Sequence, residues 1–294
     1  MAETPTNDRA PVVVLGEFDG FHLGHRQLVD AAVQLARREA RPIVGVVLDD
    51  PRAERILTTV DERCWALLAS GVGSAMAITF TDPDDPTAGA HAIDEIVGRF
   101  EPHTIVTACL PGAPTTARYP ALRAECERRG LTMVEVPRWP DPDGSWITAG
   151  RIRDALATGE VVRANDWLGR RFSLNAPVVH GSGLGHTIGF PTANLGLPPN
   201  RFVPMNGVYA AVVELPDGEE RRAAVNIGVR PTVEAHGSLV VEAHLLDFDG
   251  DLYDQRITVA FRRWLRHERR FESLDALVTQ LAADVHQIRL LLRS

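Results

Sequence analysis

The sequence predicts two domains: an α/β domain built on a parallel sheet, followed by an all-β antiparallel barrel that ends in a helix. The chain has 294 residues, and at about 150 residues per domain this length suggests two domains. Short apolar runs alternate with helical patterns up to about residue 170, and beyond it the apolar period falls to two. We therefore expect the domains to span residues 1–170 and 171–294.

The first domain is predicted from alternating strand and helix patterns. Its apolar runs predict strands at Val12–Leu15, Ile43–Leu48, Met76–Phe80, Thr104–Ala108 and Thr132–Val136. Helical patterns lie between them at Arg26–Ala40, Asp61–Ser70, Ala92–Phe100 and Ala121–Arg129. Repeated alternation of this kind predicts a parallel sheet with helices on its faces. Two further short helices are expected at Arg151–Thr158 and Val161–Leu168.

The second domain is predicted from strands that flank turns. Val208–Leu215 and Ala223–Ile227 flank the turn tripeptide Pro216-Asp217-Gly218. Leu239–Leu246 and Ile257–Trp264 flank a second polar turn. This pattern favours an antiparallel, barrel-like sheet. A final helix is expected to begin after Ser273 as its N-cap, since the apolar residues that follow recur at helical spacing: Leu274, Leu277, Leu281, Val285, Ile288 and Leu292.

Composition excludes several classes of protein. Hydrophobic residues make up 45% of the chain, which excludes global disorder, and the longest apolar runs are too short to cross a bilayer. The polar N-terminus lacks a secretory signal, so we expect a cytoplasmic protein without a membrane partner. Residues 1–170 carry 18 arginines and 25 acidic residues, and residues 171–294 carry 13 and 14. Neither part has the basic excess of a nucleic-acid binder.

The chain contains no lysine, since all 31 basic residues are arginine. This excludes a P-loop lysine, a Schiff-base lysine and a lysine nucleophile. Any phosphate must therefore be bound by backbone N–H groups, arginine, histidine or a metal ion. The three cysteines contain no C-x-x-C pair, which argues against a disulfide framework or a structural zinc site.

A glycine-rich loop follows the first predicted strand. It reads G-E-F-D-G-F-H-L-G-H over residues 16–25 and leads into a helix. Glycines allow a sharp turn and a close approach of a ligand to the backbone, and a helix start suits phosphate. His22 and His25 are three residues apart, so they share one face of a helical turn. Two imidazoles there can stabilise charge that develops on a phosphate. Taken alone, H-x-G-H would more often mark a surface loop with two solvated histidines.

The ten-residue string resembles the G-x-F-D-G-x-H-x-G-H signature of the prokaryotic FAD synthetase family, whose Rossmann-like nucleotidyltransferase domain adenylates FMN. The resemblance implies catalytic roles for His22 and His25. It implies phosphate or ATP contacts for Gly16, Phe18, Asp19, Gly20, Gly24 and the later Arg153. Class I aminoacyl-tRNA synthetases share the H-x-G-H core, but their second signature needs lysine and their RNA needs a basic surface. This sequence has neither feature, so that class is disfavoured.

Three strings of this domain depart from the family pattern. Residues 48–52 read L-D-D-P-R, where the family has F-D-P-H-P. Residues 106–112 read V-T-A-C-L-P-G in place of a glycine-rich G-x-D/N-F-x-F-G segment. Residues 148–153 read T-A-G-R-I-R, so two of the three hydroxyl positions of the family's S-S-T-x-I-R string are lost. We expect the fold to survive these changes.

A second glycine-rich loop begins the second domain. Residues 180–194 read H-G-S-G-L-G-H-T-I-G-F-P-T-A-N. Such a loop offers backbone N–H donors to triphosphate oxygens. Thr192 and Asn194 are two residues apart, so in an extended chain their oxygens point the same way. Hydroxyl and amide oxygens are hard ligands of the kind that Mg²⁺ prefers.

This stretch and four later strings resemble the riboflavin kinase domain over residues 171–292. The later strings are G-V-Y-A at 207, N-I-G-V-R-P-T-V at 226, V-E-A-H-L at 241 and L-R-H-E-R-R-F at 265. The resemblance implies that Thr192 and Asn194 hold MgATP and that Glu242 is the catalytic base. It implies ATP contacts for Gly181, Gly183, Gly185 and Gly189, and flavin contacts for Asn226 and Arg230. Riboflavin, ATP and FMN are the implied substrates, and FMN and FAD the products.

Three functional hypotheses follow. The first is a bifunctional enzyme that converts riboflavin to FMN in the barrel and FMN to FAD in the first domain. The second is a riboflavin or modified-flavin kinase whose first domain is disabled or repurposed for nucleotide binding or self-association. The third is a flavin- or nucleotide-binding protein without catalysis, which is disfavoured because Thr192, Asn194 and Glu242 are all present.

Overall fold

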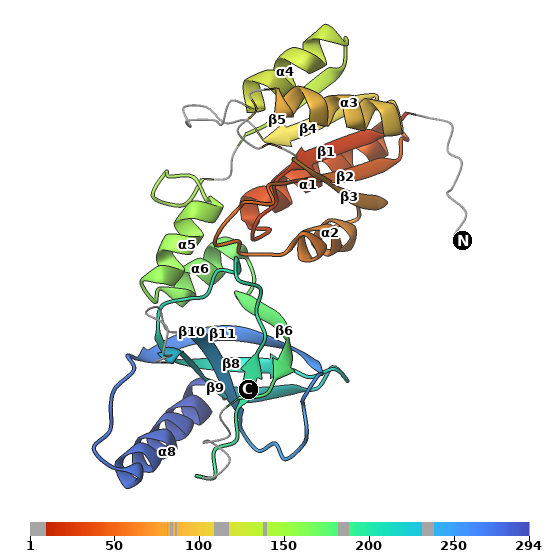
Figure 1. Ribbon diagram of the computed structural model, residues 1–294. Helices are drawn as coiled ribbons and strands as arrows, with labels where there is room; N and C mark the ends of the chain where they lie inside the picture. The colour runs from red at the N-terminus through yellow and green to blue at the C-terminus, as the bar shows by residue number, and fades with distance from the viewer. Residues whose placement is uncertain are drawn as a thin grey trace. The chain divides into compact units, whose positions relative to one another are not determined.

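The computed structural model describes residues 10–80, 82, 85, 87–108, 118–137, 140–181, 188–230 and 238–293. The chain forms two compact units, Met1–Ala149 and Gly150–Ser294, which are treated separately below (Figure 1). The two helices expected near residues 151–168 cluster with the barrel in the second unit. The expected domain spans, residues 1–170 for the nucleotidyltransferase-like domain and 171–294 for the kinase domain, stay a prediction.

The first unit is built on a parallel sheet. Among its described residues, five strands lie in the order β3-β2-β1-β4-β5. Their bounds are Val12–Gly16 for β1, Ile43–Asp49 for β2, Ser74–Thr79 for β3, Thr104–Ala108 for β4 and Thr132–Val136 for β5. The strands β1 and β4 are buried almost throughout, as expected for the centre of a sheet that is covered on both faces.

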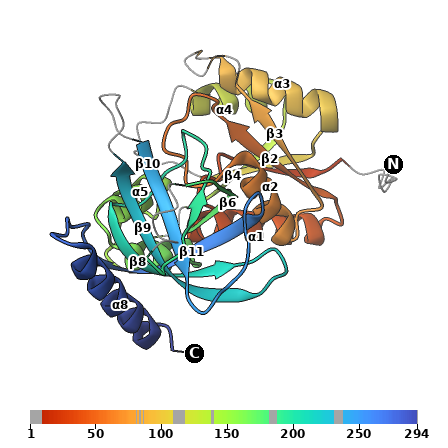
Figure 2. The ribbon, with the colours of Figure 1, turned by 60° about the horizontal axis from the view of Figure 1, so that its bottom comes forward.

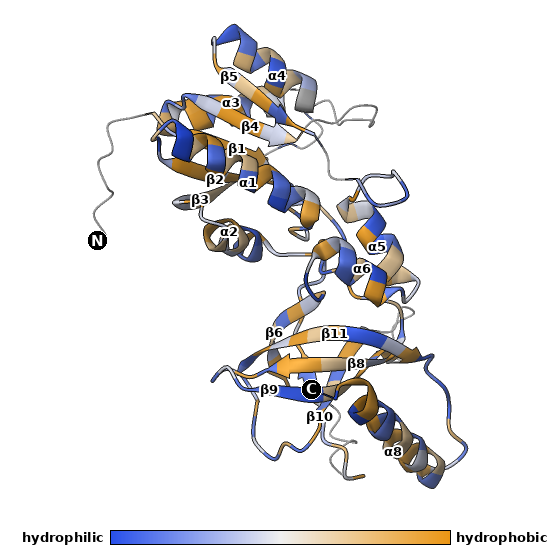
Figure 3. Ribbon diagram, turned by 180° about the vertical axis from the view of Figure 1, so that it is seen from behind, coloured by the Kyte–Doolittle hydropathy of each residue, from blue (hydrophilic) through white to orange (hydrophobic). Residues whose placement is uncertain are grey.

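Helices cover both faces of this sheet. Their bounds are Leu23–Arg38 for α1, Val60–Ala69 for α2, Ala88–Phe100 for α3 and Arg118–Arg128 for α4. Alternate residues of β1 supply two separate cores: Val12 and Val14 pack with α1 and α2, whereas Val13 and Leu15 pack with α3 and α4. The polar and apolar residues that alternate along α1 are visible in Figure 3.

The strand order indicates a ligand-binding position at the carboxyl ends of the strands. The order reverses at β1, which pairs with β2 on one side and with β4 on the other. In open α/β sheets, ligands bind beyond the carboxyl ends of the strands at this point. The loop that follows β1 carries the glycine and histidine string, so the fold brings that string to the expected position.

The second unit contains a closed barrel. In the part of the chain that the structure describes, its strands lie in the order β10-β7-β6-β11-β8-β9. Their bounds are Ser173–Val179 for β6, Ala193–Leu195 for β7, Gly207–Glu214 for β8, Glu220–Arg230 for β9, Ser238–Leu245 for β10 and Arg256–Arg266 for β11. The paired strands run antiparallel. Closure pairs each described strand with a neighbour on both sides, which protects the strand edges.

Three of the described helices accompany the barrel. The helices α5 (Ala149–Ala157) and α6 (Val161–Leu168) precede it, and the Asn165 side chain bonds the backbone of Phe172 and Phe261. The helix α8 (Leu274–Leu291) lies along the outside of the barrel (Figure 2). Its Ile288 is fully buried in a cluster with Ala210 and Ala224.

The fold class predicted from the sequence is confirmed, with differences in detail. The sequence pattern does not predict β6 and β7, because Pro177 interrupts the pattern of β6 and β7 has only three residues. Helix α1 begins three residues before the predicted start, so His25 belongs to its first turn. Leu274 of α8 is exposed, although it shares the predicted apolar spacing. None of the described helices is long and apolar enough to cross a membrane.

Candidate functional site

The loop after β1 has an unusual backbone. Phe18 and Phe21 have φ angles of 54° and 44°, and Gly20 has a φ of 79°. Left-handed φ angles cost energy for residues other than glycine, so they persist only where the surroundings impose them. Both phenylalanine rings are buried in the core beneath α1, which is the packing that holds them there.

A buried ion pair between Asp19 and Arg63 fixes the same loop to α2. The Asp19 carboxylate accepts hydrogen bonds from the backbone N–H of Thr58 at 2.9 Å and from Nη2 of Arg63 at 3.3 Å. Arg63 is only 3% exposed, and its Nη1 donates to the carbonyl oxygen of Glu17 at 3.2 Å. The Thr58 hydroxyl accepts from the N–H of Gly20 at 2.7 Å. Residues 17, 19 and 20 are therefore all tied to α2 or the turn before it.

The two histidines of the string are stacked. Their ring centroids lie 3.7 Å apart with an interplanar angle of 17°. His22 is the N-cap of α1, and a Cβ on Gly24 would lie 3.1 Å from the His22 ring, so glycine leaves room for that ring. Desolvation, with smaller effects of His22 and Arg63, lowers the pKa of His25 well below its usual range. His25 is thus held as a neutral imidazole at the start of a helix.

The residues predicted to contact phosphate near the first loop lie in different surroundings. Gly16, Gly20 and Gly24 lie between the end of β1 and the first turn of α1. The Phe18 ring is fully buried, so any contact with phosphate would come from its backbone. The Asp19 carboxylate turns inward to Arg63, so it organises the loop. Arg153 lies on α5 in the second compact unit, and its contact with phosphate stays a prediction.

The second unit brings three predicted residues into one row. Glu242 of β10 stands directly opposite Asn194 of β7 on one side and directly opposite Asn226 of β9 on the other. Residues paired in this way point to the same face of a sheet, with Cβ atoms about 5 Å apart. Because Val241 and Ala243 are buried while Glu242 is half-buried, this row lies on the outer face of the barrel.

The segment that carries Thr192 is held against the same face. The ring of His244, two residues after Glu242, has its Nδ1 atom 2.8 Å from the carbonyl oxygen of Pro191. The same ring contacts Phe190, with centroids 5.2 Å apart. Thr192 is half-buried and follows this anchored residue directly. The fold therefore places Thr192 next in the chain to a residue anchored on β10, two positions before Asn194, which stands opposite Glu242.

The first glycine of the second loop packs directly on this row. A Cβ on Gly181 would lie 2.6 Å from Cγ of Asn194, so only glycine fits here. Gly189, at the other end of the loop, has a φ of 79°, which glycine adopts without strain. Gly183 and Gly185 lie outside the described residues, as does the side chain of Arg230, and their predicted contacts stay predictions. His180 stacks on Tyr253 with centroids 4.0 Å apart.

The oxygen donors of Thr192, Asn194 and Glu242 fit a magnesium ion that also binds phosphates. A hydroxyl, an amide oxygen and a carboxylate are hard oxygen ligands, and Mg²⁺ usually takes few protein ligands beside phosphates and water. Among the described residues, no cluster of three or more His, Cys, Asp or Glu side chains forms an all-protein metal site. The residues that fit a magnesium ion here are Thr192 and Asn194.

Sequence reasoning missed the residues that support both sites. Arg63 and Thr58 hold the first loop, but no motif marks them. The nearest sequence signal is the T-x-x-E capping box at Thr59 and Glu62, which the structure contains. At the second site, Glu268 accepts a hydrogen bond from Nδ2 of Asn226 at 3.2 Å, although its sequence string also fits a solvated charge cluster.

Family models match both parts of the chain. The model described as riboflavin kinase matches residues 168–292, and the model described as FAD synthetase matches residues 4–107. The first match contains the Asn194–Glu242–Asn226 row. The second contains the loop after β1 and its histidine pair.

Relatives that match nearly the whole chain are described as enzymes with two activities. A protein of Pseudomonas fluorescens is 35% identical over 96% of this chain and 93% of its own length, and is described as a bifunctional riboflavin kinase/FMN adenylyltransferase. An Escherichia coli K12 protein of the same description is 34% identical over 93% of this chain and 90% of its own. A crystal structure described as a macrolide-efflux protein from Streptococcus pneumoniae is 29% identical, with a TM-score of 0.78 over 98% of this chain and 95% of that one.

Proposed function

The chain belongs to the family of bifunctional riboflavin kinase/FMN adenylyltransferases, and we propose that it phosphorylates riboflavin on its barrel and adenylates FMN at the loop after β1. The protein is thus an enzyme of flavin cofactor biosynthesis. The single observation that carries the kinase proposal is the register that sets Glu242 between Asn194 and Asn226. This register supports the proposal because it sets an amide, proposed here as a metal ligand, opposite a carboxylate, proposed here as the base.

In the kinase reaction, Glu242 accepts the proton of the terminal ribityl hydroxyl while that oxygen attacks the γ-phosphorus of ATP; the bond from the γ-phosphorus to the β,γ-bridging oxygen breaks, and ADP leaves. Thr192 and Asn194 would hold the magnesium ion of MgATP, which would supply neutralisation of the charge on the phosphates. The loop from Gly181 to Gly189 supplies backbone N–H groups to the triphosphate. Positioning and electrostatics supply most of the catalysis in phosphoryl transfer, so the absence of lysine is no obstacle.

In the adenylyl transfer, the phosphate of FMN attacks the α-phosphorus of ATP and pyrophosphate leaves. The helix start at α1 and the backbone of the loop bind the triphosphate. His22 and His25 donate hydrogen bonds to the α-phosphate oxygens as charge develops there. The buried Asp19–Arg63 pair supports this role, because it holds the loop in position before substrate binds.

A second candidate function is favoured by one observation. Ala149 and Gly150 replace two hydroxyl residues of the family's phosphate-binding string. A kinase with an inactive adenylyltransferase domain would retain the barrel row and lose the transfer to FAD. In that case the first unit would serve as a nucleotide-binding or self-association module.

One assay separates these functions. Purified protein is incubated with riboflavin and MgATP, and the flavins are separated by chromatography. FAD supports the bifunctional enzyme, FMN alone supports the kinase, and unchanged riboflavin contradicts both. Two variants assign the steps: His22→Ala should stop FAD formation and leave FMN formation intact. Glu242→Gln should block FMN formation from riboflavin and still convert supplied FMN to FAD.

The small-molecule partners follow from this proposal: riboflavin or a related flavin, FMN and ATP. We expect the enzyme to act in the cytoplasm. The net charge of −8 supports the expectation that it has no nucleic-acid partner. Self-association of the chain stays a prediction.

A further inference from the structure

Asn226 stands between two carboxylates. Its register partner on β10 is Glu242, and its Nδ2 atom donates a hydrogen bond to Oε1 of Glu268 at 3.2 Å. Glu268 comes from the segment after β11, whereas Asn226 lies in the middle of β9. Two segments 42 residues apart in the chain therefore meet beside the proposed catalytic base.

Glycine at position 228 leaves space for the exposed Glu268 side chain over β9. A Cβ on Gly228, two residues after Asn226, would lie 2.6 Å from Cδ of Glu268 and would collide with its carboxylate oxygen. Asn226 and Gly228 are on the same face of the strand, since alternate residues share a face. Glycine at position 228 thus opens the space into which the carboxylate reaches.

An ion pair anchors the segment that carries Glu268. Arg266 donates from Nε to Oδ1 of Asp284 at 3.0 Å and from Nη2 to Oδ2 at 2.7 Å. Asp284 is only 2% exposed and also accepts from Gln280 of α8 at 2.8 Å. Because Arg266 also bonds the carbonyl oxygen of His267 at 3.0 Å, α8 constrains the backbone directly before Glu268.

We propose that Glu268 is a positioning residue for the flavin substrate, acting through Asn226. An ionised carboxylate accepts hydrogen bonds but cannot donate them, so Glu268 selects the orientation of the Asn226 amide that presents Nδ2 to it. The Oδ1 atom of that amide then accepts a hydrogen bond from a hydroxyl or N–H group of the flavin. This inference rests on the proposed kinase function of the barrel.

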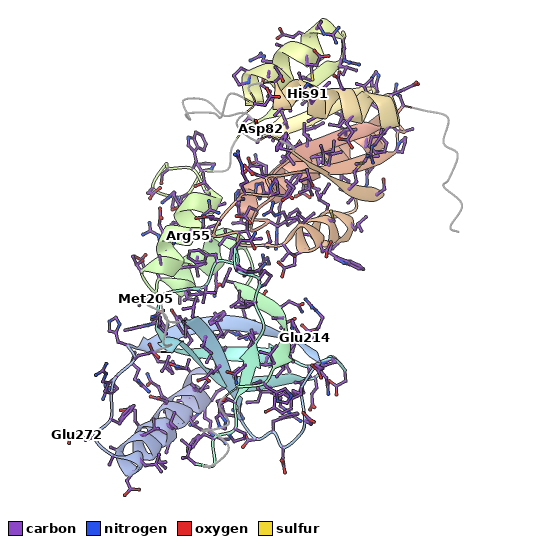
Figure 4. The ribbon with its side chains drawn as sticks, viewed as in Figure 1. Arg55, Asp82, His91, Met205, Glu214 and Glu272 are labelled. Carbon is purple, nitrogen blue, oxygen red and sulfur yellow. The ribbon has the colours of Figure 1, made fainter. Side chains whose placement is uncertain are left out.

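The test compares Glu268→Gln and Glu268→Ala with Glu272→Gln as the matched control. Glu272 is exposed and directly precedes Ser273, the N-cap of α8 (Figure 4). Loss of one charge-assisted hydrogen bond should raise the riboflavin KM about three- to tenfold in Glu268→Ala. The KM for ATP should stay within about twofold of wild type in all three variants. Wild-type riboflavin KM values in both Glu268 variants would overturn the proposal.

A double-mutant cycle tests whether Glu268 acts through Asn226. The variants are Asn226→Ala, Glu268→Ala and their combination, and the readout is the riboflavin KM. The double variant should match Asn226→Ala alone, because the amide that Glu268 orients is then missing. Independent effects that multiply in the double variant would overturn the proposal. Glu268→Gln keeps the size of the side chain but can donate as well as accept, so it no longer selects one orientation of the Asn226 amide. If Glu268→Ala fails to fold, a raised riboflavin KM in Glu268→Gln supports the proposal and a wild-type KM overturns it.

A binding titration separates failure of this inference from failure of the proposed function. If wild-type protein produces no FMN, the kinase function is wrong. Riboflavin binding measured by flavin fluorescence still tests Glu268: about three- to tenfold weaker binding in Glu268→Ala than in Glu272→Gln supports its positioning role, and equal binding overturns it.

Discussion

Asn194 and Glu242 stand directly opposite each other in the antiparallel pairing of β7 and β10. Their side chains therefore leave the barrel on the same face, about 5 Å apart at Cβ. The pairing joins residues that are 48 positions apart in the chain, and Asn194 is itself only 7% exposed. A short strand of three residues thus sets the spacing between the proposed metal ligand and the proposed base.

The register predicts that Glu242→Gln blocks the kinase step without unfolding the protein. Glutamine keeps the size of the side chain but cannot accept the hydroxyl proton as a base. We expect FMN formation to slow about 10²- to 10⁴-fold, with an unchanged melting temperature. Glu214→Gln is the control, since Glu214 is an exposed residue at the end of β8 (Figure 4). Near-normal turnover in Glu242→Gln would show that another group takes the proton.

Gly181 is predicted to tolerate no side chain. In Gly181→Ala the new Cβ would press on the Asn194 amide, so either the glycine loop or the amide must move. We expect a higher KM for MgATP and a lower kcat. Gly98→Ala is the control, because the space around Gly98 in α3 is open, and alanine there should stabilise the helix by about 1 kcal/mol. Equal kinase kinetics in the two variants would contradict the packing argument.

The sheet, the barrel and the residues of both motifs could be predicted from the sequence, because these depend on local periodicity and short strings. The strand β7 could not, since three residues carry no period, and β7 is the strand that sets Asn194 beside Glu242. Arg63 and Glu268 were missed as well. Each acts on a residue more than 40 positions away in the chain, and only the tertiary fold brings such pairs together.

The neutral His25 predicts a particular pH dependence of stability. Its pKa is lowered in the folded protein, whereas an unfolded histidine titrates at about 6.5. Between these two values the unfolded state binds more protons, so the free energy of unfolding rises with pH and falls as the pH drops below about 6.5. The slope from this one group is at most about 1.4 kcal/mol per pH unit.

Chemical denaturation gives the free energy of unfolding at each pH and checks this prediction. The pH should be varied from about 5 to 8, since this range brackets the ordinary histidine pKa of about 6.5. His25→Asn should flatten the acid side of the stability profile. The control His91→Asn replaces an exposed histidine (Figure 4) and should retain the wild-type slope. Parallel profiles for His25→Asn and wild type would contradict a lowered pKa at His25.

Arg63 predicts a large effect on both stability and FAD formation. Arg63→Met leaves the Asp19 carboxylate buried without its cation, and breaking one side of a buried pair costs about 3–5 kcal/mol. Arg63→Lys keeps the charge but cannot make the three guanidinium contacts to Asp19, Glu17 and Thr58, so its loss of stability should be smaller. Thermal denaturation of the purified variants measures both losses.

The same variants test whether the buried pair serves the adenylyl transfer. Because the pair holds the loop before α1, the FMN-to-FAD rate should be highest in Arg38→Met, lower in Arg63→Lys and lowest in Arg63→Met. Arg38 is the control, since it is an exposed residue at the end of α1. The riboflavin-to-FMN rate should stay unchanged at temperatures where each variant is folded. An Arg63→Met variant with wild-type FAD formation would show that the loop keeps its shape without the buried pair.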